Sequence, residues 1–188
     1  LQQNILAIAG MAHSEMGGLT KVIPKRAAAH DQSDLGEIIL ASPLSYDYAA
    51  GGLVATARDL SAWCSALSAG DIIGPDALRE MFTLVTLADS SETKNGYGWE
   101  KNQIAGQLTW EHSGYVPGFK ANSIYVPEQD LYLVALQNTE AGSPTPTLLK
   151  AAAICLGKPY PSPKEAMRLS KKSIDNFRGS YLFSGNRK

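Results

Sequence analysis

The stretch "WEHSGYVPGFKANSIYVPEQDLYLVALQN", residues 110–138, decides the fold. It holds three runs of strand-forming residues, separated by a bend at 116–118 and by the turn "PEQD" at 127–130. Connections this short do not allow crossovers between parallel strands. With "GYGWEKNQ" ahead of it, the stretch predicts an antiparallel meander of four strands, over 96–103, 106–114, 119–130 and 131–138.

Three helices are predicted around this sheet. The first follows Thr56, a good N-cap residue, and is ended by Gly70. Its apolar residues recur at helical spacing: Leu60, Trp63, Cys64 and Leu67. "GPDALREMFT" predicts a shorter helix with Pro75 at its first position. "SPTPTLLKAAAICLG" predicts a third, whose apolar side would cover one face of the sheet: Leu148, Leu149, Ala152, Ile154 and Cys155. The fold class is therefore α+β, an antiparallel sheet flanked by helices.

Composition bounds the size of the core and the class of partner. The chain has 188 residues, 44% of them hydrophobic, enough for one ordinary core. Its 17 basic and 18 acidic residues give a net charge of -1, which provides no concentrated basic face for nucleic acid or an anionic membrane. No apolar run approaches the ~20 residues of a membrane span.

We assign residues 1–158 to one domain and residues 159–188, which are rich in Pro and Lys, to a linker and the start of a further segment. The chain opens on apolar residues with no N-cap before them, and "FRGSYLF" near its end resembles a first strand. Both ends suggest an excerpt from a longer protein.

Cysteine and histidine spacing give little sign of cross-links or metal. Cys64 and Cys155 lie 91 residues apart, each on the predicted apolar face of a helix, so buried free thiols are favoured over a disulfide. His13 and His30 occur without an H-E-x-x-H or Cys/His spacing. The sequence calls for neither a metal site nor a cofactor.

The chemistry of the chain centres on His112, Ser113 and Gly114. At a strand end, His112 can exchange a proton near neutral pH, and Gly114 allows close approach of a ligand. A free backbone N–H beside the glycine can stabilise an oxyanion. The competing interpretation is a polar corner without function. Ser113 is a weak candidate for a nucleophile, because adjacent strand residues point to opposite faces and His112 cannot serve it as a base. Tyr46 fits either a cleft or the core.

Several segments together resemble the C-terminal half of the serine beta-lactamase and penicillin-binding-protein-like family, in particular its class C-like branch of beta-lactamases, D-aminopeptidases, DD-peptidases and esterases. They occur in this order: "IPKRAAAH", "YAAGGLVATARDLSAW", "GYGWE" and "WEHSGYVPGFKANSIYVPEQDLYLVALQN". The resemblance covers roughly residues 1–158 and implies part of a beta-lactamase/DD-peptidase-like fold.

The resemblance also implies roles for the central residues. His112-Ser113-Gly114 matches the family's third motif, K-T-G or H-x-G, with His112 in the place of the lysine. The backbone N–H of Tyr115 would share the oxyanion hole with the nucleophile's own N–H. Ser113, Gly114 and Tyr46 would contact substrate. His112 would bind a substrate carboxylate or assist proton transfer.

The chain departs from the family pattern at its first two motifs. The only S-x-x-K is Ser91–Lys94, in a polar turn rather than at the start of a buried helix, and no Y-x-N precedes "GGL". We expect both motifs upstream of Leu1. The resemblance thus implies the C-terminal fragment of a serine hydrolase that is inactive alone, acting in the parent on an ester, a beta-lactam or a D-amino-acid peptide. The alternative is an inactive binding module with the same fold. The resemblance is compatible with a periplasmic or secreted parent.

Overall fold

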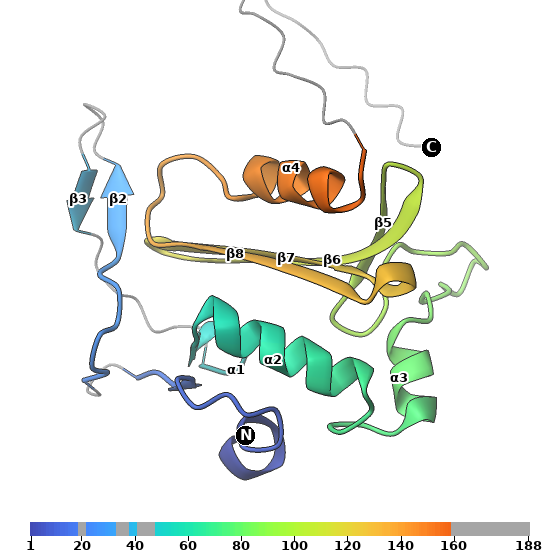
Figure 1. Cartoon of the computed structure of the whole chain (residues 1–188), viewed down its shortest axis with the longest axis horizontal. Coiled ribbons are helices and arrows are strands. Elements are labelled where there is room, and N and C mark those ends of the chain that lie inside the picture. The colour runs from blue at the N-terminus through green and yellow to red at the C-terminus, as the bar shows by residue number, and fades with distance from the viewer. Residues whose placement is uncertain (19–21, 33–37, 41–47, 159–188) are drawn as a thin grey trace, which may run out of the picture.

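The computed structural model describes residues 1–18, 22–32, 38–40 and 48–158. A four-stranded sheet lies between helix α2 on one face and helix α4 on the other (Figure 1). Its strands are all antiparallel to their neighbours and follow chain order: β5 (Glu100–Ile104), β6 (Gln107–Val116), β7 (Phe119–Val126) and β8 (Leu131–Gln137). The predicted α+β meander is confirmed.

The strands differ from their predicted bounds where turn geometry intervenes. β5 begins only at Glu100 but extends to Ile104. The chain then reverses through Ala105 and Gly106, both with positive φ, in a two-residue hairpin turn. In the bend between β6 and β7 only the second central residue, Gly118, has a positive φ (80°), and it follows Pro117.

The helices form where capping and periodicity predict them. Helix α2 spans Ala57–Ser68, and the Thr56 hydroxyl accepts a hydrogen bond from the Asp59 N–H at 3.1 Å. Helix α3 (Pro75–Met81) begins at its proline, and helix α4 spans Thr145–Cys155. Thr56 thus acts as the predicted N-cap.

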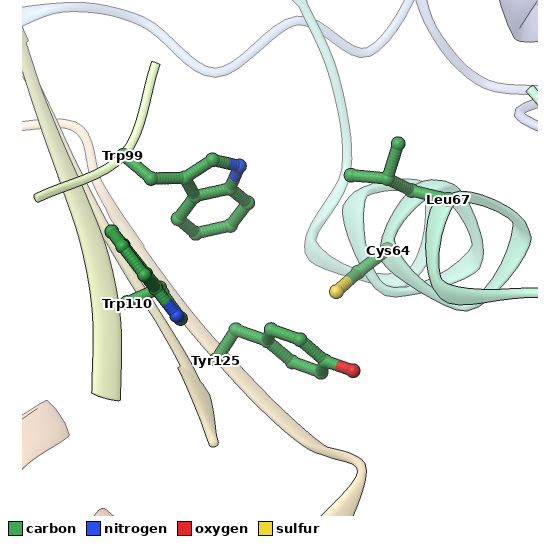
Figure 2. Packing of buried hydrophobic residues seen from close by; sticks show 5 residues of the cluster. All are labelled: Cys64, Leu67, Trp99, Trp110 and Tyr125. Atoms are coloured by element: carbon green, nitrogen blue, oxygen red, sulfur yellow. The ribbon is translucent and has the colours of Figure 1, made fainter. Parts of the chain in front are cut away.

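The core on the α2 face is aromatic. Figure 2 shows Cys64 of α2 directed toward the rings of Trp110 and Tyr125 on the sheet, with Trp99 beside them. Trp110 and Tyr125 face each other across β6 and β7. The rings of Trp63 and Trp99 stack at 6.1 Å. Such rings bury large areas, and this cluster fastens α2 to the sheet.

The core on the α4 face is aliphatic and corrects one prediction. Leu148 and Ala152 are buried against Ile124 and Val126. Ile154, in contrast, is 63% exposed, and Cys155 is exposed as well, so the prediction that both lie on the buried side was wrong. Position 154 lies outside the buried stripe that Leu148 and Ala152 define. Cys155 has the spacing of that stripe but is the last residue of α4 and is exposed there. Both cysteines are free thiols, as predicted, but only Cys64 is buried.

The N-terminal third supplies short elements around the sheet. They are a π-helical turn (Gln2–Leu6), the pair β1 (Glu15–Met16) and β4 (Leu53–Val54), the pair β2 (His30–Gln32) and β3 (Ile38–Leu40), and helix α1 (Tyr48–Gly51). The Asp59 carboxylate ties this region to α2, because it accepts hydrogen bonds from the His13 N–H and the Ser14 hydroxyl, each at 2.7 Å. Residues 159–188, predicted to be a linker and further segment, lie outside the described residues.

Candidate functional site

Strand β6 places the side chains of His112 and Ser113 on opposite faces of the sheet. His112 has the parity of Trp110, which packs on the α2 face. Ser113 pairs with Asn122, whose side-chain amide donates to the Thr145 hydroxyl at the start of α4. His112 is therefore on the α2 side and Ser113 on the α4 side, and the two cannot form a nucleophile–base pair.

The second half of β6 is an open edge. β5 pairs with β6 only as far as Glu111, whereas β7 pairs with it as far as Val116. Among the described strands, none pairs with the other side of His112–Val116. Along such an edge, alternate backbone N–H and C=O groups point outward and are free to bind an extended ligand.

Gly114 lies in the middle of this edge, and the packing of the sheet does not require a glycine there. A Cβ at position 114 would meet only the Cβ of Ala121, at an ordinary 3.8 Å. The backbone at Gly114 is not among those with positive φ. The absence of a side chain at Gly114 therefore leaves the edge open to close approach without serving the fold itself.

A hollow of about 400 Å³ lies beside this edge on the α4 side. Its walls are the central residues of the open edge, the start of β7 and the loop into α4: Ser113, Gly114, Tyr115, Lys120, Ala121, Ser143, Pro144 and Thr145. The loop wall is fixed by a hydroxyl chain, in which Ser143 Oγ donates to Thr145 Oγ1 at 3.2 Å and Asn122 donates to the same oxygen at 2.8 Å.

The structure brings together some of the predicted site residues. Ser113, Gly114 and Tyr115 all line the hollow. His112 is exposed but lies on the opposite face of the sheet from the hollow. Tyr46 lies outside the described residues. Sequence reasoning missed Lys120, Ser143 and Thr145, which carry no local motif. Lys120 could have been predicted, because a turn at 116–118 pairs it with Tyr115 on the neighbouring strand.

The Ser91–Lys94 segment lies in an exposed loop before β5, as predicted. The Ser91 hydroxyl donates to Asp89 Oδ1 at 2.6 Å, and no buried helix begins there. Within the described residues, no three His, Cys, Asp or Glu side chains gather in a way that would hold a metal ion. No helix in that part of the chain is long and apolar enough to cross a bilayer.

Comparison with known proteins shows the family to which the chain belongs. The family model described as Beta-lactamase matches residues 1–156, and the chain belongs to this family. The predicted family and fold are thereby confirmed. A search of curated protein sequences finds no match.

Solved structures agree on the fold. An octameric penicillin-binding protein homologue from Pyrococcus abyssi matches with a TM-score of 0.74 and 22% identity, over 84% of this chain and 37% of that one. A D-stereospecific amidohydrolase from Streptomyces sp. matches at 0.66 and 21%, over 80% and 46%. D-amino acid amidase from Ochrobactrum anthropi SV3, complexed with L-phenylalanine amide, matches at 0.65 and 23%, over 83% and 50%. This chain thus spans half the length of these proteins or less.

Proposed function

We propose that this chain is the C-terminal part of a serine hydrolase that cleaves an ester or amide bond through an acyl-enzyme. The membership of the beta-lactamase family and the hydrolase fold support the class. The observation that carries the proposal is the open edge of β6 at His112–Val116, with a glycine that the fold does not need and a hollow alongside.

In the proposed mechanism a serine from the missing part of the parent attacks the substrate carbonyl. The carbonyl oxygen becomes an anion, and the backbone N–H of Tyr115 donates one of the two hydrogen bonds that stabilise it. Losing one such donor typically costs ~3 kcal/mol of transition-state stabilisation. His112 binds a substrate carboxylate or assists proton transfer. The bond between the carbonyl carbon and the leaving alcohol or amine breaks, and that group departs with a proton. Water then hydrolyses the bond between the acyl group and the serine, which restores the serine hydroxyl.

The proposed substrate is an ester, a beta-lactam or a D-amino-acid peptide. His112 in place of lysine favours esters and aminopeptides. The amidase-like neighbours agree with an amide or peptide, although at 21–23% identity they support the fold alone.

The first test uses the chain itself and its parent. The 188-residue chain should turn over neither p-nitrophenyl acetate, a chromogenic cephalosporin nor D-alanine p-nitroanilide above the buffer rate. The parent, extended upstream to include an S-x-x-K segment, should be labelled by a serine-reactive fluorophosphonate. Turnover by the isolated chain contradicts the proposal, and a parent that binds peptide but is never labelled supports the binding module instead.

The second test separates site from fold. Gly114→Ala in the parent should lower kcat/KM at least ~10-fold, because the methyl group would lie on the same face as His112 and obstruct a substrate that contacts both the edge and this histidine. The stability of the fold should be unchanged or higher by about 0.5–1 kcal/mol, since alanine restricts the unfolded chain. His112→Ala should also lower kcat/KM, whereas His13→Ala, at an exposed histidine away from β6, serves as the matched control.

We also propose that the isolated chain self-associates through β8. The β5 edge carries Glu100 and Lys101, charges that discourage edge-to-edge pairing, whereas Leu131–Gln137 contains no charge. Leu136 of β8 is 44% exposed. Light scattering should give a mass above that of a monomer, and Leu136→Lys should lower it. A wild-type chain that stays monomeric at high concentration contradicts this prediction.

A further inference from the structure

One carboxylate joins the open edge of β6 to the loop that walls the hollow. Glu140 lies between β8 and α4, and its Oε1 accepts two hydrogen bonds at 2.8 Å, from the Tyr115 hydroxyl and from the Gly118 N–H. Tyr115 lies just before the bend between β6 and β7, and Gly118 lies within it. The carboxylate therefore holds the bend and the end of β6 to a segment 22–25 residues further along the chain.

Lys120 strengthens the same junction from β7. Its ammonium group donates to the carbonyl oxygens of Glu140 at 2.5 Å and Gly142 at 2.7 Å, and lies 3.9 Å from Glu140 Oε2. The side chains of Lys120 and Glu140 are only 22% and 18% exposed. Hydrogen bonds to a partly desolvated charge are about twice as strong as neutral ones.

The Tyr115 side chain depends on this contact more than on packing. It is 61% exposed, so little apolar contact holds the ring. The hydrogen bond to Glu140 raises the pKa of Tyr115, and the Gly118 N–H and then the Tyr115 hydroxyl lower the pKa of Glu140. At neutral pH the phenol therefore donates its proton to a charged carboxylate, and it is the backbone of Tyr115 at the open edge, not the phenol, that can donate to a ligand.

We propose that Glu140 is a positioning residue, which fixes the open edge at Ser113–Tyr115 against the loop wall at Ser143–Thr145. This inference rests on the proposed function for its consequence in catalysis. Beyond Glu111 the strand is hydrogen-bonded on one side only, to β7, so the contacts of the bend add to a single ladder in holding its backbone. Glu140 is the residue that contacts this bend and also belongs to the loop of the hollow wall.

The test uses the 188-residue chain and needs no substrate. Glu140→Gln removes the charge, and Tyr115→Phe removes one donor from an exposed side chain without risk to the core. The matched control is Glu128→Gln, an exposed glutamate in the 3-10 turn at the opposite end of the β7–β8 hairpin. Hydrogen exchange is followed by NMR at each amide, together with the proton shift of the Gly118 amide.

We expect the hydrogen-bonded amides of this segment, that of Gly118 first, to exchange about ten-fold faster in Glu140→Gln, because the glutamine keeps an acceptor but a charge-assisted hydrogen bond becomes a neutral one. The Gly118 amide proton should move upfield, and β5 should change less than two-fold. Tyr115→Phe should give a smaller change at the same amides, and Glu128→Gln none. Unchanged exchange, or acceleration spread evenly over the sheet, overturns the proposal. Labelling of the parent by the serine probe is a separate measurement. Failure of the positioning role of Glu140 and failure of the proposed function are therefore distinguishable.

Discussion

Replacing the buried Asp59 with alanine should lower the free energy of unfolding more than replacing any other polar side chain in or beside α2. The residue is 3% exposed, and its Oδ2 accepts hydrogen bonds from the His13 N–H and the Ser14 hydroxyl. Ser14 is itself 5% exposed, so removal of the carboxylate leaves a buried donor without its partner. The negative charge also lies in the first turn of α2, where the helix dipole favours it.

The magnitude follows from these contacts. A hydrogen bond to a charged group contributes about 1.5–3 kcal/mol, and the two bonds to Asp59 share one oxygen, so their sum is not additive. We expect Asp59→Ala to lower the free energy of unfolding by about 3 kcal/mol, and Asp59→Asn, which keeps an acceptor but no charge, by about half as much. With a urea m-value of about 2 kcal/mol/M, the alanine variant should unfold at a urea concentration about 1.5 M lower.

The pH dependence gives an independent check. Burial alone raises the pKa of Asp59, but the hydrogen bonds from Ser14, His13 and Thr56 outweigh it and lower the pKa overall. The stabilisation is therefore fully present above the pKa of the unfolded chain and is lost as pH falls through the lower pKa of the folded one. The difference between wild type and Asp59→Ala should shrink below about pH 4.

Tryptophan fluorescence can follow the unfolding, because the three tryptophans all belong to the aromatic cluster under α2. Asp71→Ala, at an exposed aspartate just after α2, is the matched control and should change stability by less than about 0.5 kcal/mol. A midpoint for Asp59→Ala within 0.2 M of wild type (well under the ~1.5 M expected), or an equal loss in Asp71→Ala, refutes the reasoning.

Two further predictions concern the helices. Leu148 is 4% exposed and packs against the sheet, so Leu148→Ala should lower the free energy of unfolding in urea by about 2–5 kcal/mol. Ile154→Ala, on the exposed side of the same helix, should lower it by less than about 1 kcal/mol. Equal losses would contradict the assigned faces of α4. Burial raises the pKa of the Cys64 thiol to about 12, whereas Cys155 is exposed. An aromatic disulfide reagent at pH 8 should therefore modify Cys155 quickly and Cys64 only after unfolding. A native chain in which both thiols react at one rate contradicts this prediction.

The sequence predicted the elements whose signals are local. Thr56 acts as an N-cap through its own side chain, and the turns after β5 and β6 are marked by glycines. Helix α4 shows the limit of such signals. Its residues are apolar nearly all round, so periodicity did not reveal which side faces the sheet, and Ile154 was placed wrongly.

In the candidate site, strand alternation was enough to predict on which face of the sheet each side chain lies. Alternation separates His112 from Ser113, and the register confirms that their side chains lie on opposite faces. The hollow was not predictable, because its second wall comes from the loop at 143–145, brought there by the packing of α4. Likewise, the link from Ser14 to Asp59 joins residues 45 apart and leaves no periodic trace.

The arrangement of the fold separates stability from the proposed chemistry. β6 is ten residues long and β5 only five, so half of β6 projects past its neighbour. The aromatic and aliphatic cores lie over the paired part, around Trp110 and Ile124. The projecting half holds exposed residues, a glycine with room for a Cβ, and a bend fastened by Glu140. Substitutions there can therefore alter ligand binding at little cost to folding, and loss of function with retained stability at Gly114 would locate the chemistry on this edge.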